Sequence, residues 1–226
     1  MTDVAAGELT PRAQQTRSAI IEAALALFRE RGYEAATMRE IASRANVSTG
    51  NAYYYFGSKE ELIEEFYAMG HAEHLAASRI VLAGQTELGA RLRGTLRALI
   101  DVNAPYHEFA ATFYKHAAEP SSPLSPFSQE SSPAREASIG LYREVVDGSS
   151  ARMSSDVRQR LPELLWLYSM GVILFWVHDR SPGCARTYHL IDVTAPMAAR
   201  LIAATRIPML RSTVKDLAAL IDDLRN

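Results

Sequence analysis

Apolar residues recur at helical spacing along almost the whole chain, and no segment shows sustained alternation of apolar and polar residues. This pattern predicts an all-α protein. We expect the first helix over 13–31, where Gly32 ends it. Residues 1–12 are expected to be a disordered leader. The apolar face of that helix has the spacing i, i+4, i+7 and i+8 and consists of Ile20, Ala24, Leu27 and Phe28.

Two short helices are expected next. Thr37 stands three residues before Glu40, the spacing of a capping box, and opens a helix that breaks at Asn46 and Val47. Ser48 is the N-cap expected for a third helix that runs to about residue 56. Two short helices joined by a tight turn, with a longer helix upstream, are typical of a helix-turn-helix, whose second short helix lies in the major groove of DNA.

A fourth helix is predicted from Ser58, which with Glu61 repeats the capping-box spacing. The character of the sequence changes after residue 73. The segment 120–133 contains four prolines and six serines and is expected to be a surface loop, with a lid over a pocket as the alternative. Further helices are predicted over about 88–104, 106–118, 134–147, 156–178, 184–206 and 212–225.

The third helix carries the candidate DNA-binding chemistry. At 100° per residue, Ala52 and Phe56 share a core-facing stripe, whereas Tyr53 and Tyr54 point away from it. Exposed tyrosines suit DNA, because their hydroxyls reach phosphates and their rings contact thymine methyls. We expect the tyrosines and Lys59 to position the protein on phosphates. Thr49 and Asn51 are expected to lie nearer to the base edges. The candidate set is Thr37, Ser48, Thr49, Gly50, Asn51, Tyr53, Tyr54, Tyr55 and Lys59.

Composition sets limits on the function. The 226 residues are 48% hydrophobic and 22% charged with a net charge of -2, which excludes a wholly basic, histone-like protein. Residues 11–59 carry six arginines and Lys59 against four glutamates, but residues 1–73 as a whole carry seven basic against eleven acidic residues, so any positive surface must be local. The alternative at this point is a small three-helix unit with its tyrosines in a protein interface.

The sequence gives no membrane or export signal. Residues 1–9 carry Asp3 and Glu8 without an apolar run, which argues against a signal peptide. The longest uncharged apolar run, 164–177, has fourteen residues, short of the ~20 that a membrane helix needs. We therefore expect a cytoplasmic protein without a membrane span, in which this run is a buried helix.

Residues 16–66 resemble the N-terminal domain of the tetracycline-repressor (TetR) family of bacterial regulators. The one departure noted is Asn46, where the family usually has Gly, and Asn tolerates the positive φ of such a turn. The positions that carry the resemblance are Thr16, Arg17, Ile20, Ala23, Ala24, Leu27, Phe28, Gly32, Tyr33, Thr37, Ile41, Ala42, Ala45, Val47, Ser48, Gly50, Tyr53, Phe56, Lys59 and Leu62.

The resemblance implies a helix-turn-helix domain over 13–73 and a helical effector-binding and dimerisation domain over 74–226. It implies a sequence-specific transcriptional regulator of double-stranded operator DNA, by family default a repressor that a small molecule releases. It also implies a homodimer through the helices 156–178 and 184–206. Within the second of these, a coiled-coil-like seam is expected from Leu190, Thr194, Met197, Leu201 and Ala204.

An effector pocket is expected in the centre of the C-terminal domain, which is rich in aromatic residues. Its occupant should be mostly apolar with one or two polar anchors. The sequence leaves open which aromatic residues line the pocket and which belong to the ordinary core. The candidates for the pocket are Tyr106, Phe109, Phe113, Tyr114, Tyr142 and Trp166.

The sequence gives little support for a metal, redox or catalytic site. His71 and His74 are i, i+3 and could hold a metal, but solvated helix-surface residues are the expectation, and no metal site or cofactor is predicted. Cys184, the single cysteine, excludes an internal disulfide and could be a redox sensor if Arg180 and Arg186 depress its pKa. No catalytic motif appears, so we expect no enzyme. The alternative function is a small-molecule-binding or interaction protein with a vestigial DNA-binding domain.

Overall fold

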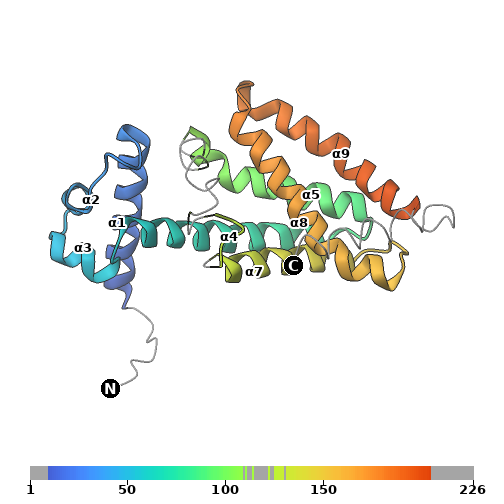
Figure 1. Cartoon of the computed structure of the whole chain (residues 1–226), viewed down its shortest axis with the longest axis horizontal. Helices are drawn as coiled ribbons and strands as arrows, with labels where there is room; N and C mark the ends of the chain where they lie inside the picture. Colours follow the sequence, from blue (N-terminus) through green and yellow to red (C-terminus); the bar gives the residue numbers. More distant parts are fainter. Residues whose placement is uncertain are drawn as a thin grey trace, which may run out of the picture.

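The computed structural model describes residues 10–108, 110, 114, 122, 125–129 and 131–204, and its described elements are all helical, as predicted. The N-terminal leader up to residue 9, Phe109, Phe113 and the expected helix 212–225 lie outside the described residues. Helices α1 to α3 form a small unit at one end, and the remaining helices form a larger body (Figure 1). The elements are α1 Pro11–Arg31, α2 Met38–Arg44, α3 Thr49–Tyr55, α4 Lys59–Ala83, α5 Leu88–Asn103, η1 Ala104–Tyr106, α7 Ser132–Asp147, α8 Ser155–His178, η2 Pro182–Cys184 and α9 Ala185–Ala204.

The ends of the N-terminal helices follow the expected start and stop signals, with two corrections. α1 begins at Pro11, inside the expected leader, because the Thr10 side chain accepts a hydrogen bond from the Ala13 N–H at 3.3 Å and Pro is favoured in a first turn. The capping box of Thr37 and Glu40 is confirmed. At α4, the Ser58 side chain caps the helix as expected. The Glu61 side chain does not complete the capping box, because it accepts from the N–H of Gly57 at 2.8 Å rather than from that of Ser58.

The three N-terminal helices and the start of α4 enclose the first core. Ile20, Phe28, Ile41 and Leu62 lie in its centre and are almost fully buried. Asn46, in the turn between α2 and α3, has φ 55°, which confirms the expected positive φ. The turn and the core together hold α3 at a fixed angle on α1 and α2.

α4 connects the two parts of the molecule as one continuous helix (Figure 1). Its first half contributes Leu62 and Ile63 to the first core, and Leu75 and Leu82 pack in the second core. The expected domain boundary at residue 73 therefore falls inside a helix rather than in a linker. A displacement of this helix would act on both cores.

The second core lies among α4, α5, α7, α8 and α9. Leu92, Leu96, Tyr142 and Val145 are among its most deeply buried residues. The apolar run of α8 contributes to this core, and α8 is the one described helix that is long and apolar enough to cross a membrane by length and composition. Since α8 packs against α5, α7 and α9, its apolar character has an explanation within the fold.

Arg91 joins the ends of two helices in this body. Its buried guanidinium donates to the carbonyl oxygens of Leu82 and Gln85, at the end of α4, and of Glu144 and Val145, near the end of α7, at 2.5 to 2.9 Å. The last turn of a helix has few donors for its carbonyl groups, although Leu82 and Glu144 also accept from backbone N–H groups just beyond their helices. Arg91 thus adds hydrogen bonds at both helix ends.

Candidate DNA interface and effector cavity

α3 presents its tyrosines as the angular reasoning predicted. Ala52 and Phe56 are buried in the first core, whereas the side chains of Tyr53 and Tyr54 are 52% and 81% exposed. Tyr55 differs from them: it is half-buried, packs against the first core, and its ring centroid lies 5.3 Å from that of Tyr54. The exposed face of α3 therefore consists of polar and aromatic side chains on a rigid support.

The start of α3 is ordered by its cap. The Ser48 hydroxyl accepts from the Asn51 N–H at 3.1 Å, and Thr49, Gly50 and Asn51 are exposed. The Thr37 hydroxyl also has a partner within the protein, because it donates to the Glu40 carboxylate at 2.9 Å. Ser48 and Thr37 thus shape the two helix starts, which leaves exposed backbone N–H groups and neighbouring side chains to meet a ligand.

Lys59 is more constrained than the sequence suggested. Its ammonium donates to the Tyr33 carbonyl oxygen at 2.9 Å and lies 4.5 Å from the centroid of the Tyr33 ring. A lysine ammonium has three donors, so two remain for other acceptors. A substitution of Lys59 therefore touches the fold as well as any phosphate contact.

The structure adds residues that the sequence reasoning missed. An open, polar groove runs between the start of α1 and the start of α3, and Arg12 and Thr16 lie along it together with the predicted Asn51. The sequence does not indicate Arg12, because it falls within the expected leader. Its side chain is exposed and makes no ion pair with the described residues, and the same holds for Arg39 in α2.

Much of the positive charge of the small unit is neutralised away from this groove. Arg17 pairs with Glu65, Arg31 with Glu40, and Arg44 with Glu30 through two hydrogen bonds. The pairs of Arg31 and Arg44 are exposed to solvent, so they contribute little to stability. The cations left to act on a ligand of this unit are therefore local, as the charge count predicted.

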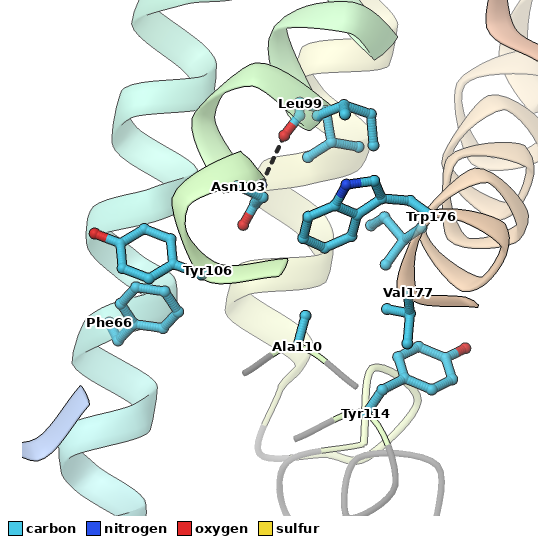
Figure 2. A pocket seen from close by; sticks show the side chains of 10 residues that line it. Phe66, Leu99, Asn103, Tyr106, Ala110, Tyr114, Trp176 and Val177 are labelled. Atoms are coloured by element: carbon cyan, nitrogen blue, oxygen red, sulfur yellow. Dashed lines mark hydrogen bonds between the residues drawn. The ribbon is translucent and has the colours of Figure 1, made fainter. Parts of the chain in front are cut away.

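A second candidate site is a cavity of about 90 Å³ where the two cores meet (Figure 2). Phe66 of α4 and Tyr106 of η1 form one wall, with ring centroids 4.6 Å apart, and both also pack against the first core. α8 supplies the opposite wall. The lining consists of Phe66, Leu99, Ile100, Asn103, Tyr106, Ala110, Tyr114, Ile173, Trp176 and Val177.

The expected pocket residues divide accordingly. Tyr106 and Tyr114 line the cavity, while Tyr142 and Trp166 do not, because both are buried in the second core between α7 and α8. Phe109 and Phe113 lie outside the described residues. The other eight lining residues are not among the predicted ones. One of them, Trp176, lies in the same apolar helix as Trp166, and helical spacing alone does not distinguish the two.

The rival sites are corrected by the fold. His74 is buried rather than solvated, with Nε2 3.0 Å from the Thr95 carbonyl oxygen, because α4 continues past the expected boundary and packs on α5. His71 is half-buried, and no group of three metal-ligating side chains occurs among the described residues. Burial and the nearby Asp179 carboxylate raise the pKa of Cys184, whereas the redox hypothesis required a lowered pKa.

The outer faces of α8 and α9 expose apolar side chains. Leu167, Leu174 and Phe175 of α8 are about two-fifths exposed, and in α9 Met197 and Leu201 are 47% and 68% exposed. Within the expected seam, Thr194 instead turns toward α8, where its hydroxyl meets that of Tyr168. Exposed large apolar side chains on two neighbouring helices are typical of a protein interface.

Comparison with known families decides the assignment. A family model of the tetracyclin repressor-like C-terminal domain matches residues 91–220, more than half of the chain, and one of the bacterial regulatory proteins of the tetR family matches residues 20–66. The chain belongs to the TetR family. The resemblance over residues 16–66 is thereby confirmed, and the helical C-terminal region of this TetR chain belongs to the same family. The family is one of regulatory proteins, not of enzymes.

Individual relatives match mainly the N-terminal part. The HTH-type transcriptional repressor KstR2 of Mycobacterium tuberculosis is 41% identical over 63 residues, 28% of this chain and 30% of its own length. The HTH-type transcriptional regulator TtgR of Pseudomonas putida is 34% identical over 88 residues, 39% of this chain and 40% of its own length. The chain thus matches well under half of these relatives' lengths.

Solved structures share the fold across most of the chain. The fatty acid degradation regulator FadR of Bacillus halodurans has a TM-score of 0.65 at 17% identity and covers 84% of this chain and 96% of its own. Thermus thermophilus FadR, a repressor solved with lauroyl-CoA, has a TM-score of 0.56 at 24% identity and covers 80% and 93% of the two chains. At such identities the likeness shows the fold alone.

Proposed function

We propose that this TetR-family protein is a cytoplasmic, sequence-specific transcriptional repressor that binds operator DNA through α3. The observation that carries the proposal is the exposure of Tyr53 and Tyr54 on a short helix whose opposite face is fixed in the first core. Tyr53 and Tyr54 lie outside the first core, and exposed tyrosines match the phosphates and thymine methyls of a major groove.

The DNA contacts divide by position. Thr49 and Asn51, which are exposed at the start of α3, contact base edges in this proposal, while Tyr53, Tyr54 and the remaining donors of Lys59 contact phosphates. Arg12 and Thr16 extend this surface along the groove beside α1. Phosphate contacts fix the orientation of the protein, and base contacts supply its specificity.

The functional unit is a homodimer. One short recognition helix reads few base pairs, and two-fold pairing places a second copy on the next half-site. The exposed apolar side chains of α8 and α9, including Met197 and Leu201, form the surface on which a second copy packs.

A small-molecule effector releases the repressor from DNA. The cavity supports this step by its location, since Phe66 and Tyr106 belong both to its wall and to the packing around the first core. A ligand that presses on this wall favours a different position of α4 and hence a different spacing of the two recognition helices. The ratio of the ligand's affinities for the two spacings determines how much the affinity for DNA decreases.

The test compares two substitutions on a duplex selected from random sequence. Tyr54→Phe removes a hydrogen bond from an uncharged donor to a charged phosphate, so we expect binding to weaken about 10-fold or more without a change in salt dependence. Lys59→Gln removes one charge, and the slope of log affinity against log salt should fall by roughly one. Arg143→Gln, an exposed change on α7, is the matched charge control and should leave both quantities unchanged.

Circular dichroism of each variant confirms folding, which matters for Lys59 because of its bond to Tyr33. Unaltered affinity and slope in Lys59→Gln would show that this helix start does not face the DNA backbone. If no duplex is enriched and random DNA is not bound, the alternative of a ligand-binding protein with a vestigial DNA-binding domain replaces the regulator.

A further inference from the structure

The helix that joins the two parts of the molecule contains a glycine near its middle, Gly70 of α4. In a helix interior glycine is about 5-fold less favourable than alanine, because it loses more conformational freedom on folding. Packing does not require glycine here, since a Cβ atom at Gly70 would have no described neighbour within 4 Å. At Gly94 of α5, by contrast, the same atom would lie 2.2 Å from the Val81 side chain. Gly70 therefore weakens α4 without relieving any close contact.

The small unit of α1 to α3 contacts the part of α4 that precedes Gly70. Leu62 and Ile63 are buried in the first core, and Phe66 packs against it. Ala68 and Met69, which follow, are exposed. Among the side chains that the structure describes, contact with the first core thus ends about one helical turn before Gly70.

The larger body contacts α4 directly after Gly70. The Ser138 hydroxyl of α7 lies 3.5 Å from His71 Nδ1, and His74 Nε2 lies 3.0 Å from the Thr95 carbonyl oxygen of α5. From there α4 continues into the second core. Gly70 therefore stands between two sets of contacts, one to each part of the molecule.

The cavity lies beside this position. Phe66, one turn before Gly70, forms a cavity wall with Tyr106, and both rings pack against the first core. The opposite wall belongs to α8 of the larger body (Figure 2). A ligand that moves these walls relative to each other acts across Gly70, because Phe66 precedes the glycine on the side of the small unit and α8 belongs to the body.

We propose that α4 bends at Gly70, and that this bend changes the position of the small unit relative to the larger body. This inference rests on the proposed function and locates the movement by which a ligand in the cavity acts on DNA binding. Glycine adopts backbone angles that other residues avoid, and small residues often absorb such changes at hinges. The bend leaves both cores intact, since none of the described side chains at 68–70 belongs to either core.

Gly70→Ala tests the hinge without adding strain. The new methyl group has no described neighbour within 4 Å, and alanine favours the straight helix about 5-fold over glycine. Gly140→Ala is the matched control, because Gly140 lies in the interior of α7 and a Cβ atom there also has no described neighbour within 4 Å. Both changes favour their helices equally, but Gly70→Ala alone should restrict the movement between the two parts.

Pulsed EPR between two spin labels measures this movement in the full-length protein. The labels are attached through Thr49→Cys in α3 and Arg143→Cys in α7, both at exposed positions, and Cys184→Ser removes the native thiol. Dilution with unlabelled protein limits the signal to distances within one chain. The wild type should show a second population of distances, which Gly70→Ala should reduce about 5-fold and Gly140→Ala should leave unchanged.

Hydrogen exchange of the unlabelled wild type gives an independent measurement. The backbone amides of 70–74 should exchange faster than those of 62–66 and 78–82, because a bend at Gly70 opens the helical hydrogen bonds around it. Gly70→Ala should slow this local exchange about 5-fold. The wild-type comparison does not depend on whether a variant folds.

A single population of distances in the wild type would overturn the proposal, as would uniform exchange along α4. A second population that Gly70→Ala leaves unchanged, or that Gly140→Ala reduces as strongly, would also overturn it. DNA binding of the unlabelled wild type is measured separately. DNA binding with a single population of distances contradicts the hinge alone, whereas the expected distances without DNA binding contradict the proposed function alone.

Discussion

The turn between α8 and α9 contains a carboxylate on which the geometry of the proposed dimer surface depends. Asp179 is buried, and its Oδ1 accepts from the N–H and hydroxyl of Ser181 at 2.9 and 2.7 Å. Its Oδ2 accepts from the N–H and hydroxyl of Thr187 at 2.9 and 2.7 Å. These four bonds fix the start of α9 against the end of α8.

Asp179→Asn replaces one acceptor oxygen by an NH2 group that faces a backbone N–H, and it removes the charge from the remaining bonds. At least one hydrogen bond to a charged group is lost, worth about 1.5 to 3 kcal/mol, so the free energy of unfolding should fall by about 2 kcal/mol or more at pH 7. Asp156→Asn, an exposed change in the first turn of α8, should cost less than about 1 kcal/mol and is the matched control. Urea unfolding at fixed protein concentration measures both.

The effect should depend on pH. Burial raises the pKa of Asp179, but the hydrogen bonds from Ser181 and Thr187 outweigh burial and hold the pKa well below its usual range. A carboxyl with a lowered pKa stabilises the fold above its unfolded pKa of about 3.9, and this contribution is lost as pH falls toward the folded value. The difference between wild type and Asp179→Asn should therefore shrink below about pH 4. Equal stability at pH 7 would refute the role assigned to this carboxylate.

Three further outcomes are expected. Burial lowers the pKa of His74 to about 4. The neutral imidazole therefore contributes its full stability above the unfolded pKa of about 6.5, and the free energy of unfolding should fall by up to about 3 kcal/mol as the pH falls to 4. Urea unfolding of His74→Gln should show a smaller fall over the same pH range. Arg91→Lys cannot reach all four carbonyls and should lose about 2 to 4 kcal/mol of unfolding free energy, and a loss below about 0.5 kcal/mol would contradict this role. Leu201→Glu should shift the protein toward monomer in sedimentation equilibrium, whereas Ile80→Glu, at a similarly exposed position on α4, should not. A wild-type protein that sediments as a monomer would contradict the proposed dimer.

Local signals predicted the N-terminal part of the fold well. The caps at Thr37 and Ser48 and the turn at Asn46 depend on interactions within a few residues, so the sequence pattern contains them directly. The exposure of Tyr53 and Tyr54 followed from helix geometry and the position of Ala52. Local spacing and a well-defined family pattern here indicate the same structure.

The less accurate predictions concern contacts between distant segments. The sequence predicts a solvated His74 because it does not show that α5 covers that face of α4. The sequence favours Trp166 over Trp176 for the pocket without a local reason, because both lie in one apolar helix and tertiary packing alone decides which side faces the cavity. Arg12 falls within the predicted leader, whereas Thr10 as an N-cap and Pro11 in the first turn start α1 earlier.

Selection of duplexes from random sequence by the purified full-length protein tests the central proposal most directly. We expect an enriched sequence with two-fold symmetry, which fluorescence anisotropy at physiological salt should show to bind at least about 1,000-fold more tightly than a random duplex. Tyr54→Phe should weaken this specific complex. Failure to enrich any sequence, or equal affinity for selected and random duplexes, would contradict a sequence-specific regulator that reads DNA through α3.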